Sequence, residues 1–162
     1  MKQRTLLLVM LLIGCFTLGT GITNEASAQR QTQVGKQLKN HSRKMINRTF
    51  VVLNKARQAA KSGQNFTGDL ARAKAHQRFA VKMHHEGKLR LAMYHTHRSR
   101  VLARKFINDN NGQLPVEADF TQDELDKLGN IPPDDELDGR LPAQEFHDNQ
   151  ALKEDWEGLS ID

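Results

Sequence analysis

Histidine side chains gather in one stretch of this 162-residue chain, and histidine is a common metal ligand. Five of the seven histidines lie between positions 76 and 97. His84 and His85 directly follow one methionine, and His95 and His97 follow another. Imidazole with thioether sulfur suits copper, and imidazole alone suits zinc. Neighbours on a helix point about 100° apart, so the spacing predicts a bridging site of two or three ligands, or scattered surface histidines that bind no metal.

Carboxylates near the C-terminus have a spacing that suits calcium. Asp134, Glu136, Asp138 and Glu145 stand at positions 1, 3, 5 and 12 of a segment with Gly139 at position 6. This pattern resembles an EF-hand calcium loop, in which a glycine turn lets alternating carboxylates converge. The resemblance implies calcium binding through these four residues, with Glu145 as the bidentate ligand. The expected dissociation constant is no tighter than about 10⁻⁴–10⁻³ M, as in extracellular modules.

The same segment has a second interpretation. Glu136 is long for the third position, and Pro142 stands at the ninth. Pro132 and Pro133 occupy the place where an EF-hand would have the end of its entering helix. The competing prediction is a one-turn helix that begins at Pro133 and is capped by Gly139, with carboxylates in solvent. Calcium then has no site here and the chain needs no cofactor.

Residues for catalysis are scarce. Between positions 29 and 107 the only carboxylates are Asp69 and Glu86, and Cys15 is the only cysteine of the chain. The serines lack the strand-turn-helix context of a nucleophile elbow. We therefore expect a binding or structural protein and no enzyme.

Charge divides the chain into two parts. Residues 29–107 hold nineteen Lys and Arg against two carboxylates, and residues 108–162 hold sixteen Asp and Glu against three Lys and Arg. A basic surface of this kind favours an anionic polymer, lipid headgroups, an acidic protein or the chain's own acidic segment as its partner. Removing the residues after Asn110 is expected to strengthen binding to heparin or DNA.

The first 28 residues resemble a secretory signal peptide, with a positive start, an apolar run over 6–13 and the small residues Ala26-Ser27-Ala28. Cleavage there would make Gln29 the mature N-terminus. Residues 12–15 also resemble a bacterial lipobox, in which Cys15 would be acylated, and an uncleaved anchor is the third possibility. Each predicts an exported protein of the periplasm, the cell envelope or the medium. Export makes nucleic acid an improbable partner, and no transmembrane span is expected in the mature chain.

Apolar periodicity predicts three helices in the basic part, over residues 34–61, 68–86 and 88–108. The first helix is expected to end at Gly63, the second at Gly87 and the third at the run 108–112. The junction at Gly87 resembles the middle of a tetratricopeptide hairpin, but it occurs once, and an ordinary αα-hairpin is the simpler interpretation.

The acidic part predicts two short helices. Thr121 and Glu124 form a capping box before a helix that stops at Gly129. A last helix over 142–157 would place Trp156 on a face that docks against the body. The expected domains are a signal peptide (1–28), a basic helical domain (29–110) and an acidic segment (111–162). The predicted fold class is all-α, a three-helix antiparallel bundle or αα-hairpin body with a short-helical acidic C-terminal segment.

Overall fold

The computed structural model describes residues 21–162, with side chains from Thr32 onward. Its helices are α2 (Gly21–Ala59), α3 (Asp69–His85), α4 (Leu89–Asp109), the 3₁₀ turn η1 (Val116–Ala118), α5 (Gln122–Leu128), α6 (Asp134–Asp138) and α7 (Asp148–Lys153). No strand occurs in this part of the chain, so the fold is all-α as predicted. Most of the expected signal peptide lies outside the described residues, and Ala26-Ser27-Ala28 falls within α2.

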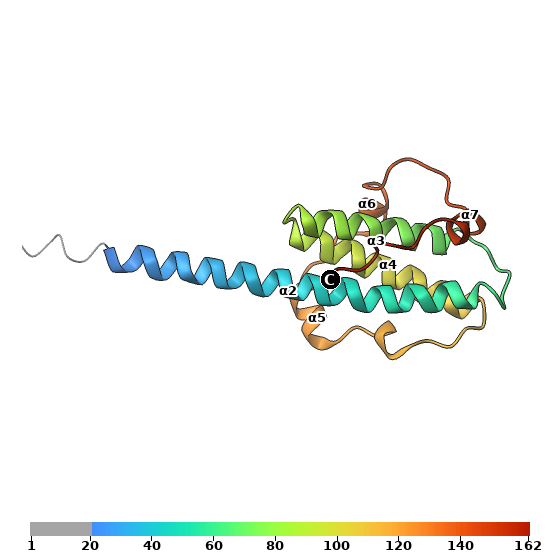
Figure 1. Ribbon diagram of the computed structural model, residues 1–162, viewed down its shortest axis with the longest axis horizontal. Coiled ribbons are helices and arrows are strands. Elements are labelled where there is room, and N and C mark those ends of the chain that lie inside the picture. The colour runs from blue at the N-terminus through green and yellow to red at the C-terminus, as the bar shows by residue number, and fades with distance from the viewer. Residues whose placement is uncertain (1–20) are drawn as a thin grey trace, which may run out of the picture. The chain divides into compact units, whose positions relative to one another are not determined.

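The described chain divides between Gln37 and Leu38, and the unit after this point is Leu38–Asp162. This unit contains both the basic helices and the acidic segment. Within it, α3, α4 and the part of α2 after Leu38 lie side by side (Figure 1). The short elements of the acidic segment lie around these three helices.

The hairpin of α3 and α4 turns at Gly87. Its φ of 76° is a left-handed conformation that favours glycine. The N–H of Lys88 donates to Met83 O at 2.9 Å and the N–H of Gly87 donates to His84 O at 3.0 Å. These two bonds form a Schellman motif, which satisfies the last carbonyls of α3 and reverses the chain.

The core confirms the apolar faces expected from periodicity. On α2, Met45, Val52 and Ala56 are fully buried. On α4, Ala92 and Phe106 are fully buried. The main core also includes Ala118, Trp156 and Leu159 of the acidic segment. Its larger members are Val52, Leu53, Leu70, Leu102, Phe106, Ile107, Trp156 and Leu159. The bundle is therefore completed by residues that come last in the sequence.

The acidic segment follows its sequence signals in part. Thr121 and Glu124 form the predicted capping box at the start of α5, with both reciprocal bonds present. The one-turn helix α6 has Pro133 at its N-cap and Gly139 at its C-cap, which is the competing interpretation of the calcium-like segment. The predicted last helix was too long, because α7 has six residues. Residues 142–147 are not helical, and the chain turns after Glu154 so that Trp156 enters the core.

Within residues 21–162, no helix combines the length and the apolar character that a membrane crossing would need.

Candidate functional site

The four carboxylates of the calcium-like segment do not point to a common centre. Asp134 accepts a hydrogen bond from Arg98 at 2.5 Å, and Asp138 accepts two from the same guanidinium at 2.9 Å each. Because α6 is helical, these two side chains lie one turn apart on the face turned to α4. Both carboxylates are thus engaged by the cation of Arg98, where a calcium site would need them free.

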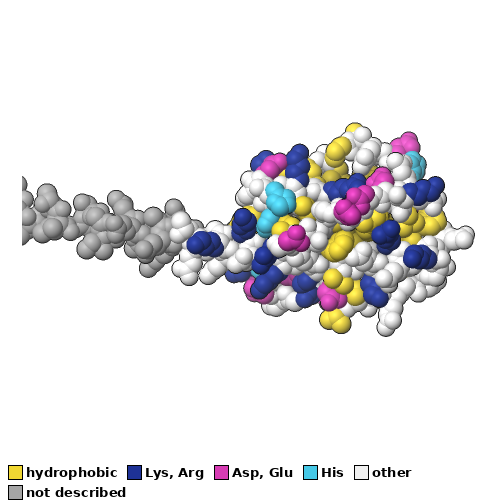
Figure 2. Space-filling model, in the orientation of Figure 1, with side chains coloured by type: hydrophobic (Ala, Val, Ile, Leu, Met, Phe, Trp, Pro, Cys, Tyr) yellow, Lys and Arg dark blue, Asp and Glu magenta, His cyan; other side chains and the backbone are white. Residues whose placement is uncertain are grey.

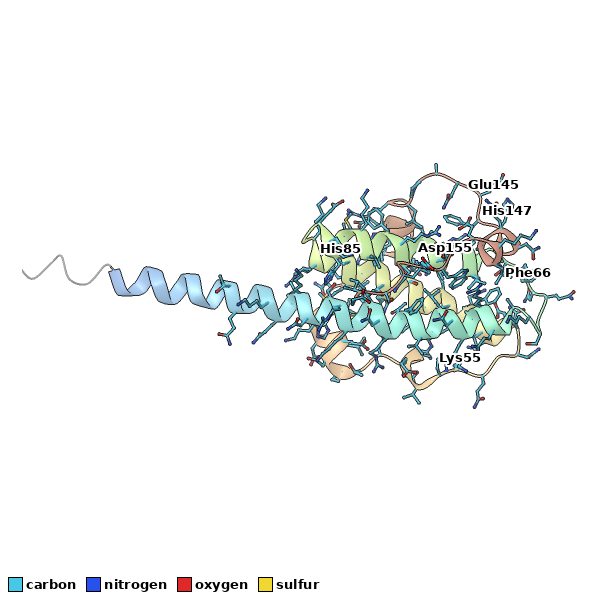
Figure 3. All side chains as sticks on the ribbon, viewed as in Figure 1. Lys55, Phe66, His85, Glu145, His147 and Asp155 are labelled. Carbon is cyan, nitrogen blue, oxygen red and sulfur yellow. The ribbon has the colours of Figure 1, made fainter. Side chains whose placement is uncertain are left out.

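The other two carboxylates are engaged elsewhere. Glu136 accepts from Arg140 at 2.6 Å on the outer face of α6, and Glu145 lies beside His147 at 3.0 Å on the following segment (Figure 3). In the described part of the chain, no three His, Cys, Asp or Glu side chains are grouped to hold a metal ion. The geometry therefore gives the calcium hypothesis no support.

The histidines expected to bridge a metal are also separated. His84 bonds to Ser42 of α2 at 3.1 Å, and its ring meets that of His85 edge-on with centroids 5.9 Å apart. His97 stacks on Phe120, with centroids 4.4 Å apart. His95 contacts none of these side chains, and it lies between α3 and α4. The helical spacing sends these side chains in different directions, so only His84 and His85 remain neighbours.

His95 instead takes part in a buried chain of three side chains that the sequence did not indicate. Its Nδ1 lies 2.8 Å from Nδ1 of His76, and Nε2 of His76 lies 2.9 Å from Asp138 Oδ1. Both histidines are fully buried. His76 and His95 stand opposite each other across the antiparallel hairpin, so the helix register could have paired them. Asp138 could not have been added, because nothing in the sequence places α6 over this point.

The carboxylate of Asp138 sets the direction of each hydrogen bond among these three side chains. The carboxylate of Asp138 only accepts, so Nε2 of His76 donates to it and Nδ1 of His76 accepts from His95. The remaining Nε2 of His95 then carries a lone pair, and this buried atom has no partner among the described residues. Burial lowers the pKa of His76 to about 4 and that of His95 to about 3. Both rings are neutral at pH 7, and they bind α6 to the hairpin.

Arg100 forms the second buried connection to the acidic segment. This fully buried side chain donates two hydrogen bonds to Glu124, at 3.0 Å each, and one to Met45 O at 3.1 Å. Burial alone raises the pKa of Glu124, but the bonds from Arg100 and the N–H of Thr121 bring it below the ordinary value. The pair joins α2, α4 and α5 at one point.

Lys74 forms the third connection. Its Nζ donates to Ala151 O and to Glu154, both at 3.0 Å, and lies 5.0 Å from the centre of the Trp156 ring. Burial lowers the pKa of Lys74, although Glu154 partly opposes this. The lysine is held by groups from α7 and the turn after it, and an outside anion would have to displace them.

After these pairings, several cations without a carboxylate partner remain, and some of them lie at the end of the bundle near Gly87. The pKa of His84 is lowered by burial and then by the charges of His85, Lys39 and Arg43, with no carboxylate among the causes. Lys39, His85 and Arg90 are exposed, and none has an ion pair among the described contacts of residues 32–162. We call Lys39, Arg43, His85 and Arg90 the hairpin-end surface. On the visible face of the folded unit, Lys and Arg side chains and Asp and Glu side chains are both scattered among apolar ones (Figure 2).

Comparison with protein-family models, with curated proteins and with solved structures finds no match for this chain.

Proposed function

We propose that this chain is an exported, non-catalytic helical protein that binds an anionic partner through its hairpin-end surface. The observation that supports the proposal is that the charges of Lys39, Arg43 and His85 all act on His84, with no carboxylate among the groups that shift its pKa. Arg43 also donates to the backbone O of Asp162 at 3.4 Å, and Glu86 is paired with Lys88 at 2.8 Å. An anionic polymer or a surface of anionic headgroups would meet the exposed Lys39 and Arg90, which have no ion pair among the described contacts of residues 32–162.

The rest of the basic body is a weaker candidate for this role. Lys74, Arg98 and Arg100 are buried and paired with the acidic segment. Displacing those carboxylates would leave buried charges without partners, which is costly. Lys55 on α2 and Lys61 in the turn after it are exposed, and neither is among the charges that act on His84. They serve as matched controls.

The test compares two double variants of equal charge change. Lys39→Gln with Arg90→Gln should lower the salt concentration at which the protein elutes from heparin, because each lost contact reduces counterion release by about one ion. The same variant should bind less to vesicles with anionic headgroups, while neutral vesicles bind neither form. Lys55→Gln with Lys61→Gln should elute close to the unchanged protein. Equal losses in both variants would contradict a local site and indicate a response to net charge alone.

The non-catalytic part of the proposal is supported by burial. The chain of Asp138, His76 and His95 has no exposed histidine atom to act on a substrate. A metal-binding role for the envelope, the alternative from sequence, has no converging ligands in its favour among residues 32–162. Export is tested by the mass of the mature N-terminus, which distinguishes a start at Gln29 from an acylated Cys15.

A further inference from the structure

A groove lies between α3 and the segment that follows α6. Its volume is about 450 Å³, within the range of small-molecule sites. One wall is the outer face of α3, and the other is the chain from Arg140 to Gln144. The lining residues are Ala75, Arg78, Phe79, Lys82, Arg140, Leu141, Pro142 and Gln144.

The segment over this groove is fixed at both ends. Leu141 is buried at one end. At the other end the carboxylate of Asp148 accepts from the N–H groups of Gly68 and Ala71, at 2.8 Å each. Between them residues 142–147 are not helical. A second cavity of about 90 Å³ lies next to the groove along α3, because the two share Ala75, Arg78 and Gln144 in their linings.

The groove combines an apolar floor with a cationic rim. Phe79, Leu141 and Pro142 provide the apolar surface, and the lining contains no carboxylate. Two of its three cations are already paired, Arg78 with Glu154 and Arg140 with Glu136, whereas Lys82 has no ion pair among the described contacts of residues 32–162. A cation without an ion pair in the lining, beside apolar side chains, suits a ligand with a single anionic group and an apolar chain.

We propose that this groove binds a fatty-acid anion, with the acyl chain along Phe79 and Leu141 and the carboxylate at Lys82. The inference goes beyond the hairpin-end surface, because it concerns a small amphiphile and a different set of side chains. Burying a chain on the apolar floor supplies the driving force, at roughly 25 cal/mol for each Å² removed from water. The ion pair at Lys82 then distinguishes an anionic head from a cationic one.

Calorimetric titration with monomeric dodecanoate tests the site in the full chain. The unchanged protein should bind one dodecanoate, and it should bind dodecyltrimethylammonium at least about tenfold more weakly. Ala75 is half-buried on α3 and lines the groove. The larger side chain of Ala75→Leu would fill the groove and should abolish binding of dodecanoate. Lys82→Gln should weaken it about tenfold. Lys61→Gln makes the same charge change at an exposed position in the turn after α2 and should have no effect.

Thermal melting of each variant shows whether it is folded, and a folded Ala75→Leu protein that still binds dodecanoate would overturn the proposal. Equal affinity for the cationic amphiphile would also overturn it. The result is separable from the hairpin-end proposal, because Lys39→Gln with Arg90→Gln should leave dodecanoate binding unchanged and Ala75→Leu should leave heparin elution unchanged.

Discussion

Arg100 shows at the level of a single residue how the acidic segment is joined to the helices. The side chain is fully buried, and its partner Glu124 is nearly so. Removing Arg100 leaves the buried charge of Glu124 with only the N–H of Thr121 and Arg48, whose Nε lies 3.3 Å away. Losing one member of a buried pair costs far more than the pair contributes. Arg104, one turn later, pairs with Asp119 at 3.3 Å, but Asp119 is 81% exposed. An exposed pair of this kind contributes little.

Arg100→Met should therefore lower the free energy of unfolding by about 3–5 kcal/mol, and Arg104→Met by less than about 1 kcal/mol. Urea denaturation of the two variants measures the difference. Adding Glu124→Gln to Arg100→Met should recover part of the loss, because the buried carboxylate is then neutral. Equal and small losses for both single variants would show that Glu124 is satisfied by other groups.

Such pairs could not be predicted from sequence. The charge imbalance indicated that the acidic segment has basic residues to meet, and the capping box located α5 correctly. Which arginine would be buried was not indicated, because Arg98, Arg100 and Arg104 have the same chemistry and lie close together on one helix. The long-range contact with Glu124 selects Arg100, and that contact depends on the loop between α4 and α5.

His97 makes the stability of the fold depend on pH. Its pKa is lowered to about 4, first by burial and then by the charges of Arg100 and Arg98, while Asp134 and Glu124 oppose them. An unfolded chain protonates histidine near its ordinary pKa of 6.5. Between these values the unfolded state binds more protons, so stability is full above about pH 6.5 and is lost as the pH falls toward 4.

His97→Phe keeps an aromatic ring against Phe120 and removes this proton. The number of protons taken up on unfolding between pH 6.5 and 5 should then fall by about one. Melting temperatures measured over this range give that number. An unaltered slope in His97→Phe would mean that His97 is already protonated in the folded protein.

At the level of the element, α3 begins with a cap supplied by a residue far along the chain. Gly68 has a φ of 86°, and its own residue type offers no side-chain oxygen. Asp148 takes that role, because its two oxygens accept from the N–H groups of Gly68 and Ala71. A side chain at Gly68 would also meet Phe146 O at 2.7 Å. The glycine is thus needed for its conformation and for the close approach of the acidic segment.

Asp148→Ala should cost about 1–2 kcal/mol of stability, the usual loss when a helix cap is removed. Amide exchange at Gly68 and Ala71 should accelerate more than at the C-terminal turn of α3. Hydrogen exchange followed by NMR measures both. Asp135→Ala, in the exposed first turn of α6, is the matched control. Unchanged exchange at Ala71 in Asp148→Ala would show that the cap does not stabilise α3.

Elements within the basic part were predictable because their signals are local. The faces of α2 and α4 follow from apolar spacing, and the turn follows from Gly87. The last helix was predicted too long because residues 142–147 contain no strong stop after Pro142. Their conformation is set by the anchoring of Asp148 to α3, a contact between residues about eighty positions apart.

At the level of the whole molecule, the acidic segment is part of the folded structure. It contributes Trp156 and Leu159 to the main core, Leu128 to a smaller core and carboxylates to buried Arg100 and Lys74. This changes the outcome expected from sequence for a chain that ends at Asn110. Without the segment, buried cations would lose their partners and apolar surface would be exposed, so the three helices would have no complete core.

A chain ending at Asn110 should therefore lose cooperative thermal unfolding while keeping much of its helical circular dichroism, since local helix signals remain but fixed packing is lost. Its tighter binding to heparin would then report an unfolded polycation.

The full chain in rising salt provides the comparison. Surface pairs weaken as the Debye length falls to about 3 Å at 1 M, whereas buried pairs are screened much less, so the full chain should stay cooperatively folded. If the shortened chain melts cooperatively and binds heparin as a folded domain, the acidic segment is a removable cover, because the helices would then be stable without the groups that the segment supplies.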